Sequence, residues 1–257
     1  MTETAAKVDP SGRTAIVTAA SRGIGLAIAA ALVARGDRVL VTGRNPESLE
    51  AAVATLGGPQ WAVAVAGKAH DEAHQEQAVA RAIDAFGRVD FLVNNVGTSP
   101  VFGPLVEQTT EVVRKILDIN VLAALGWTRG VHAAWMGQHG GAIVNVSSVA
   151  GFRPAPGIGA YGMSKAALSY LTGQLALELA PAVRVNAVAP AIVKTHFAQA
   201  LYAGREDQVT EGYPLGRLGE PVDVAGTVAY LLSDAASWVT GQTIVLDGGS
   251  TLVGGAG

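Results

Sequence analysis

Short apolar runs alternate with longer, alanine-rich stretches from Thr14 onward. The short runs are rich in valine and isoleucine and end at glycine, proline or polar residues, which is typical of β-strands. We expect strands at residues 14–19, 38–42, 61–66, 91–94, 142–147, 183–188 and 243–246. The stretches between them, beginning with residues 23–35, have helical composition. Because these strands are apolar on both faces, the pattern predicts a doubly wound α/β fold, a parallel sheet with helices on both sides.

The pattern also predicts how the chain is organised. No charge run, repeat or low-complexity linker divides it, so we expect a single domain over residues 13–257. Residues 1–12 lack the apolar core of a signal peptide and are expected to form a flexible N-terminal tail. The least regular stretch, near residues 194–214, is polar and lies between two strands. We interpret it as a lid over a substrate site.

Composition and charge exclude several classes of protein. The 257 residues include no cysteine, which rules out disulfides, thiolate metal sites and a cysteine nucleophile, and suits a reducing, cytoplasmic location. A net charge of -3 provides no basic surface for nucleic acid. The longest apolar run, residues 26–34, is about half the ~18 residues that a membrane-spanning helix needs. We therefore expect neither nucleic acid nor a membrane as a partner.

A glycine-rich turn follows the first strand and leads into a helix. Its residues are Thr18, Ala19, Ala20, Ser21, Arg22, Gly23, Ile24 and Gly25. Glycine lets backbone N–H groups approach a phosphate closely, and the helix N-terminus adds partial positive charge. A tight turn without any ligand would show the same residues, so the turn alone leaves both readings open.

Several further motifs follow in order along the chain. They are Asn94-Asn95-Val96-Gly97, Asn120 within Asp-Ile-Asn-Val, Ser148, Tyr161-Gly-Met-Ser-Lys165 and Pro190-Ala191. With the glycine-rich turn, this series over about residues 13–252 resembles the short-chain dehydrogenase/reductase family, most closely the 3-oxoacyl-acyl carrier protein reductases. The resemblance implies a single Rossmann-type sheet, a nicotinamide cofactor, a small-molecule carbonyl or alcohol substrate and a homotetramer or homodimer.

The resemblance also implies which residues bind the cofactor. They are Thr18, Ala20, Ser21, Arg22, Gly23, Ile24, Gly25, Arg44, Asn94, Val96, Gly97, Tyr161, Lys165, Pro190, Ile192, Val193 and Thr195. Ala19 and Ala191 stand where the family has glycine. Alanine is tolerated there if φ is negative and strained if φ is positive, and we expect binding to be retained.

Cofactor choice depends on the end of the second strand. An acidic residue there would bind the ribose 2′-hydroxyl of NAD(H), whereas arginine pairs with the 2′-phosphate of NADP(H). The chain has Arg44 at this place, with Arg22 as a second cation. We expect NADP(H) to be preferred, with NAD(H) also usable, unless both arginines are merely solvated surface charges. The residue that contacts adenine is left open.

Tyr161 and Lys165 are four residues apart in a helical stretch and share one face. A neighbouring ammonium is expected to lower the tyrosine pKa from about 10. The resemblance implies that Ser148 hydrogen-bonds the substrate oxygen, Tyr161 donates its proton, Lys165 also holds the nicotinamide ribose, and Asn120 anchors a proton-relaying water. Ser147 is the adjacent alternative, but strand alternation and the spacing to Tyr161 favour Ser148.

The resulting hypothesis is an NADP(H)-dependent oxidoreductase that interconverts a ketone, with 3-oxoacyl thioesters among the candidates, and a secondary alcohol. The alternative is a non-catalytic, dinucleotide-binding regulatory protein on the same fold. The histidines lack a metal-ligand spacing and no Gly-x-Ser-x-Gly motif is present, so we expect neither a metal site nor a hydrolase. Residues 98–102, 149–159 and 194–213 are expected to contact substrate; their apolar side chains are Phe102, Phe152, Ile158, Phe197 and Tyr202.

Overall fold

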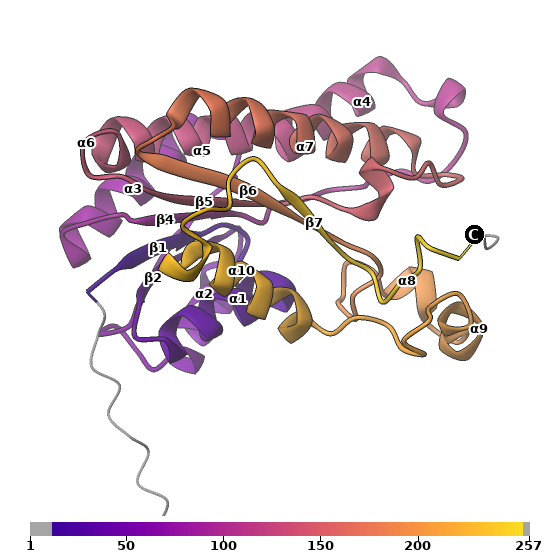
Figure 1. Ribbon diagram of the computed structural model, residues 1–257, viewed down its shortest axis with the longest axis horizontal. Coiled ribbons are helices and arrows are strands. Elements are labelled where there is room, and N and C mark those ends of the chain that lie inside the picture. Colours follow the sequence, from indigo (N-terminus) through magenta and orange to yellow (C-terminus); the bar gives the residue numbers. More distant parts are fainter. Residues whose placement is uncertain (1–11, 254–257) are drawn as a thin grey trace, which may run out of the picture.

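The computed structural model describes residues 12–253, so the expected tail, apart from Gly12, lies outside the described residues. One sheet carries this part of the chain, with parallel strands in the order β3-β2-β1-β4-β5-β6-β7 (Figure 1). The strands are β1 (Thr14–Val17), β2 (Arg38–Gly43), β3 (Ala62–Ala66), β4 (Phe91–Asn94), β5 (Gly141–Val146), β6 (Val183–Pro190) and β7 (Thr243–Leu246). The predicted doubly wound parallel sheet is confirmed, and the predicted strands differ from these only at their ends.

Helices cover both faces of the sheet. The longer ones are α1 (Gly23–Ala34), α2 (Pro46–Thr55), α3 (Glu72–Phe86), α4 (Thr110–Leu117), α5 (Ala123–Val131), α7 (Gly159–Leu179) and α10 (Pro221–Leu232). Figure 1 shows α1, α2 and α10 on one side, and α3, α4, α5 and α7 on the other. The short helices are α6 (Gly137–His139), α8 (Gln199–Tyr202) and α9 (Glu206–Thr210).

Two buried apolar clusters explain why the strands lack polar alternation. Ala15 and Val17 of β1 pack in the cluster that includes α1, α2 and α10. Ile16, between them, packs in the other cluster, with Trp127 of α5. Successive side chains of a strand point to opposite faces, so a strand with a helical layer on each side must be apolar throughout.

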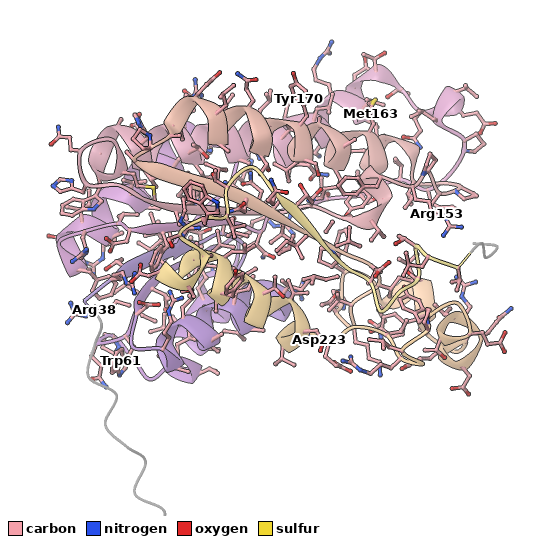
Figure 2. The ribbon with its side chains drawn as sticks, viewed as in Figure 1. Arg38, Trp61, Arg153, Met163, Tyr170 and Asp223 are labelled. Carbon is pink, nitrogen blue, oxygen red and sulfur yellow. The ribbon has the colours of Figure 1, made fainter. Side chains whose placement is uncertain are left out.

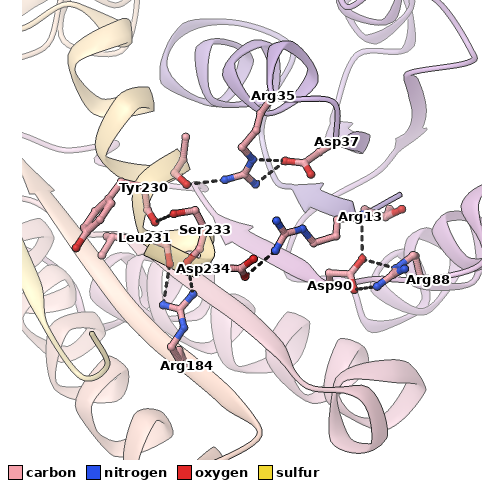
Figure 3. A network of polar contacts seen from close by, with 12 residues as sticks. Arg13, Arg35, Asp37, Arg88, Asp90, Arg184, Tyr230, Leu231, Ser233 and Asp234 are labelled. Atoms are coloured by element: carbon pink, nitrogen blue, oxygen red, sulfur yellow. Dashed lines mark hydrogen bonds and ion pairs between the residues drawn. The ribbon is translucent and has the colours of Figure 1, made fainter. Parts of the chain in front are cut away.

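A polar network joins the amino ends of the strands (Figure 3). Arg184 of β6 donates to the carbonyl oxygens of Leu231 and Ser233 at the end of α10, over 2.8 and 3.1 Å. Arg35 donates to a third carbonyl there and to Asp37, with which it also forms an ion pair. These cations satisfy carbonyls that have no partner within the helix and complement its negative end.

The carboxyl ends of the strands form the opposite edge of the sheet. The chain leaves β1 toward α1 on one face, whereas the helices that follow β4 cover the other face. The strand order therefore reverses between β1 and β4, which opens a crevice beyond their carboxyl ends. The residues predicted to bind cofactor and substrate follow these strands.

Candidate active site

The glycine-rich turn after β1 is held by its neighbours. The Ala20 N–H donates to the Thr42 carbonyl over 2.9 Å, and Asn95 Nδ2 donates to the carbonyls of Thr18 and Ala19 over 3.0 and 3.2 Å. A methyl group at Gly25 would lie 2.6 Å from Asn95 Nδ2, so close packing requires glycine there. Sequence reasoning did not assign Asn95, whose side chain organises this turn.

Ala19 has a φ of +51° and is the one non-glycine residue with positive φ among residues 12–253. The side chain of an L-residue is strained in this left-handed region. Alanine would be tolerated at a negative φ and is strained at a positive one, so the backbone at Ala19 is strained. Ala191, the second departure from glycine, has no positive φ, so its methyl group adds no such strain.

The N-terminus of α1 fits a phosphate group. No side chain caps it, no acidic residue lies in its first turn, and Gly23 has a φ of +59°. The first N–H groups of a helix lack partners within the helix, and here they face the crevice beyond β1. The pyrophosphate of a dinucleotide would satisfy them, so the residues present suit such a cofactor.

Two arginines lie close together here: Arg22 in the glycine-rich turn and Arg44 just after β2. A methyl group at Gly43 would lie 3.6 Å from Ser21 Cβ, so the residue after Gly43, Arg44, follows directly beside the turn that carries Arg22. Both arginines are exposed, and neither forms an ion pair with any residue that the structure describes. Two arginine side chains, both without a carboxylate partner in the described chain, are therefore available to bind an anion beside the glycine-rich turn.

Asn94 differs from the other predicted cofactor residues because its side chain points into the core. Its Nδ2 donates to Asn145 Oδ1 over 2.9 Å, and Asn145 donates to the Thr172 hydroxyl over 2.9 Å. All three residues are buried, so this chain of amides and a hydroxyl joins β4, β5 and α7. Only the backbone of Asn94 remains for a cofactor.

Tyr161 and Lys165 lie on the face of α7 that meets the end of β5. The Lys165 side chain is buried and its Nζ donates to the Val146 carbonyl over 2.8 Å. This Nζ lies 5.7 Å from the centre of the Tyr161 ring, and a methyl group at Gly97 would lie 3.5 Å from it. The Tyr161 hydroxyl is close enough to the Ser148 hydroxyl for Ser148 to influence its pKa. The residue after β5, Ser148, and the two residues of α7 thus lie together beside the loop after β4.

The two adjacent serines at the end of β5 have different surroundings. Ser147 is buried, and its hydroxyl contacts the Lys165 carbonyl and the Ser169 hydroxyl, both over 2.9 Å. Ser148 lies on the Tyr161 side, partly exposed, where its hydroxyl also accepts from the Ala150 N–H over 3.2 Å. Of the two serines, Ser148 thus has the more accessible hydroxyl.

The pKa values in the site follow from burial. Burial lowers the pKa of Lys165 from 10.5 to about 8. Burial also raises the pKa of Tyr161 above its usual value, and the hydrogen bond with Ser148 opposes this shift. The expectation that a neighbouring ammonium lowers the Tyr161 pKa is thus wrong for the chain by itself, because desolvation of the phenolate outweighs the favourable contacts. A neutral phenol is the form that can donate a proton.

Asn120 lies in a π-helical turn, η2 (Asp118–Leu122), between α4 and α5. Its Oδ1 accepts from the Thr98 N–H over 2.8 Å, and its Nδ2 donates to the Thr98 carbonyl and the Ser164 hydroxyl over 3.0 and 2.9 Å. Single π-helical turns are frequent at functional sites. The side-chain amide is engaged within the protein, so the proposed water would have to bind the main chain of this turn.

The segment after β6 closes one side of the site. A methyl group at Gly23 would lie 3.4 Å from Thr195 Cγ2, so Thr195 reaches the glycine-rich turn. The rings of Phe197 and Tyr161 have centres 6.2 Å apart. The Ile192 N–H donates to the Tyr213 hydroxyl over 3.2 Å, which ties the two ends of the segment together. This segment contains α8 and α9 and lies against the predicted catalytic tyrosine.

The residues that follow β3 have structural roles of their own. Asp71 caps α3 by accepting from the Ala73 N–H over 3.1 Å, and the buried ring of His74 fills the space beside Gly67. Within residues 12–253 no group of three histidine or acidic side chains could hold a metal ion. The same part of the chain has no helix long and apolar enough to cross a membrane.

Comparison with known proteins agrees with this arrangement. Residues 18–251 match a family model described as enoyl-(acyl carrier protein) reductase. The human protein dehydrogenase/reductase SDR family member 4 is 42% identical over 250 residues, 94% of this chain and 89% of that protein. The Caenorhabditis elegans protein of the same name is 40% identical over 246 residues, 93% of this chain and 95% of that protein. The chain belongs to the short-chain dehydrogenase/reductase family.

Solved structures of this family have the same architecture. A short-chain dehydrogenase/reductase of Brucella melitensis, titled glucose/ribitol dehydrogenase, superimposes with a TM-score of 0.89 at 34% identity, over 95% of this chain and 98% of that one. A short-chain type dehydrogenase/reductase from Mycobacterium ulcerans gives a TM-score of 0.88 at 34% identity, over 95% and 91% of the two chains. The chain is therefore an oxidoreductase of the short-chain dehydrogenase/reductase type, a family whose members use NAD(P)(H).

Proposed function

We propose that the protein is an NADP(H)-dependent oxidoreductase that interconverts a ketone and a secondary alcohol, with Ser148, Tyr161 and Lys165 as its catalytic residues. The observation that carries this proposal is their convergence beside the glycine-rich turn. Ser148 comes from the end of β5, and the other two come from one face of α7. A dinucleotide-binding protein without chemistry would not require this convergence.

The roles follow from the chemistry of each group. Ser148 Oγ is partly exposed beside Tyr161, and its proton makes a long contact of 3.4 Å with the Pro190 carbonyl, so the hydroxyl can turn to donate to a substrate carbonyl instead. Tyr161 is protonated at neutral pH and supplies a proton to the same oxygen as negative charge develops there. Lys165 has one hydrogen bond within the described chain, to Val146, so two of its three donors remain for the nicotinamide ribose and a proton relay. NADPH, when bound, supplies the hydride.

The preference for NADP(H) over NAD(H) is proposed from the charges beside the glycine-rich turn. Arg22 and Arg44 are exposed cations without carboxylate partners in the described chain. A ribose 2′-phosphate would pair with them, whereas NAD(H) offers no anion at that place.

The substrate is proposed to have an apolar body. Phe197 lies against Tyr161, and Phe102 and Phe152 are 77% and 54% exposed on the loops after β4 and β5. These loops begin at the carboxyl edge of the sheet, where α/β enzymes bind their substrates. An apolar wall beside the acid contributes to binding of a hydrophobic ketone or acyl chain by removing its surface from water.

We also propose that the protein forms a homotetramer through two apolar surfaces. Met163, Tyr170 and Leu177 of α7 are spaced seven residues apart and exposed, the last two at 77% each. Figure 2 shows Met163 and Tyr170 pointing outward from the helix. Trp238, just before β7, is 99% exposed. Two separate apolar surfaces suit two different two-fold contacts, which together build a tetramer. Light scattering of Tyr170→Lys and Trp238→Lys variants tests this, since each should yield dimers.

The decisive experiment measures NADPH oxidation with a panel of hydrophobic ketones, 3-oxoacyl thioesters and enoyl thioesters, with NADH in parallel. Ketone-dependent oxidation of NADPH is the expected result. Tight binding of NADPH without turnover of any member of the panel would instead support the non-catalytic regulatory protein. Turnover of enoyl thioesters alone would contradict reduction of a carbonyl group.

A further inference from the structure

Ser164 connects Asn120 to the turn of α7 that carries Tyr161. Its side chain is completely buried. The Ser164 hydroxyl donates to the Tyr161 carbonyl over 2.7 Å and accepts from Asn120 Nδ2 over 2.9 Å. Since Asn120 is itself bonded to both backbone groups of Thr98, Ser164 is the contact by which the loop after β4 and the π-helical turn reach the tyrosine.

Ser147 makes an equivalent contact at the other end of the same turn. Its hydroxyl donates to the Lys165 carbonyl over 2.9 Å. A hydroxyl has a single proton, so Ser169 must be the donor in the 2.9 Å contact between the two serines. The neighbouring residue of β5, Val146, accepts from Lys165 Nζ. Val146, the last residue of β5, and Ser147, which follows it, therefore hold the ammonium and the backbone of Lys165.

These contacts lie behind the site and not in it. Ser147 and Ser164 are 3% and 0% exposed, so neither hydroxyl can reach a substrate. Helix carbonyls already accept one hydrogen bond within the helix, and these hydroxyls occupy the second lone pair. The Asn120–Ser164 and Ser147–Lys165 contacts join α7 to two different segments, which fixes the rotation and the axial position of its first turns.

We propose that Ser164 and Ser147 are positioning residues, Ser164 for the Tyr161 hydroxyl and Ser147 for the Lys165 ammonium. This inference rests on the proposed function, because it assigns the two serines to the reaction of Tyr161 and Lys165. Catalytic groups must be held close to their productive geometry, and that geometry depends on partners behind them.

The test compares Ser164→Ala and Ser147→Ala with Thr128→Val as a matched control. Thr128 of α5 is 2% exposed and its hydroxyl donates to the Ala124 carbonyl of its own helix over 2.9 Å. All three substitutions thus remove one buried hydroxyl bonded to a helix carbonyl, and only the first two act on the turn of Tyr161 and Lys165. We measure the melting temperature, the Kd for NADPH, and kcat with the best ketone.

We expect Ser164→Ala to lower kcat about tenfold with little change in the Kd for NADPH, because a displaced acid slows the chemistry without removing binding contacts. Ser147→Ala is expected to raise the Kd for NADPH about fivefold, since Lys165 is proposed to hold the ribose. Thr128→Val should lose a similar amount of thermal stability with kcat and Kd unchanged. If the two serine variants had the same kcat and the same Kd for NADPH as Thr128→Val, with similar losses of melting temperature, the proposal would be overturned.

Hydrogen exchange of the cofactor-free protein gives a readout independent of turnover. Ser164→Ala and Ser147→Ala should speed exchange of the amides in the first turns of α7 and leave its C-terminal turns unchanged; unchanged exchange throughout α7 would contradict the positioning role. If the wild-type protein reduced no ketone, the proposed function would be refuted. The hydrogen-exchange result tests the positioning role independently of that outcome. If an alanine variant fails to fold, Ser→Cys, which keeps the side chain's shape with a much weaker donor, replaces it.

Discussion

Asn95 Nδ2 donates to the carbonyl oxygen of Ala19 over 3.2 Å, and Ala19 has a φ of +51°. Glycine adopts this conformation without strain. We expect Ala19→Gly to raise the free energy of unfolding by about 1 kcal/mol and the melting temperature by about 2–4 °C. Ala30→Gly is the control: Ala30 is exposed within α1, where glycine destabilises by about 0.5–1 kcal/mol. If Ala19→Gly and Ala30→Gly shifted the melting temperature in the same direction, Ala19 would not be strained.

Tyr161→Phe removes the proposed proton donor and keeps the ring that packs near Phe197. We expect turnover to fall by at least about 100-fold, the low end of what a positioned acid contributes, with the Kd for NADPH unchanged. Steady-state kinetics and quenching of protein fluorescence by NADPH measure the two quantities. A variant that kept a tenth of the wild-type rate would exclude Tyr161 as the acid.

Lys165 makes the stability depend on pH because its pKa is about 8 in the folded protein and 10.5 when exposed. Between these pH values the unfolded chain binds more protons than the folded one. The contribution of Lys165 to the free energy of unfolding is therefore least favourable below pH 8, where the buried ammonium is charged, and rises as the pH increases from 8 to 10.5, by up to about 1.4 kcal/mol per pH unit. Urea unfolding of wild type and Lys165→Met should diverge in this window, and parallel curves would show that Lys165 does not titrate there.

Arg44 is expected to discriminate between the two cofactors. Arg44→Ala should raise the KM for NADPH about tenfold, the loss expected for one charge-assisted hydrogen bond, and leave the KM for NADH unchanged. Arg81→Ala is a suitable control, because Arg81 pairs with Asp84 on the exposed face of α3. Equal increases for both cofactors would indicate that Arg44 acts on the fold and not on the 2′-phosphate.

Arg184 is expected to matter for stability and not for catalysis. Arg184→Ala leaves the carbonyls of Leu231 and Ser233 without their donor, and we expect a loss of about 2 kcal/mol. Arg81→Ala, which breaks an exposed pair, should lose less than about 0.5 kcal/mol. Chemical denaturation measures both, and similar small losses would show that Arg184 does not stabilise the end of α10.

The sequence was sufficient to predict the sheet because strands β1 to β6 are largely buried on both sides and therefore appear as short apolar runs, whereas β7 at the edge of the sheet is partly exposed. The shared face of Tyr161 and Lys165 followed from their spacing of four residues along a helix, whereas the place of Ser148 beside them was implied by the resemblance to the short-chain dehydrogenase/reductase family. Periodicity and connectivity, which can be followed along a chain, thus predicted the sheet and the helix face.

Other features depend on contacts between distant segments. The π-helical turn at Asn120 is a shift in backbone hydrogen bonding with no sequence signal, and Asn120 reaches Thr98 and Ser164 only in the folded protein. Ala19, with its positive φ, has its carbonyl held by Asn95, which follows the neighbouring strand β4. The direction of the Tyr161 pKa required knowledge of its burial, which the spacing to Lys165 does not provide.

The arginine network lies at the amino edge of the sheet, and the residues proposed to bind cofactor and substrate lie at the carboxyl edge. Loops at the carboxyl edge can therefore be exchanged between relatives while the contacts that anchor α10, β1 and β6 stay in place. In protein engineering, thermal stability and the range of substrates accepted become separate targets. A chimera carrying a relative's residues 195–213 should take on new substrates and still melt near the temperature of the parent.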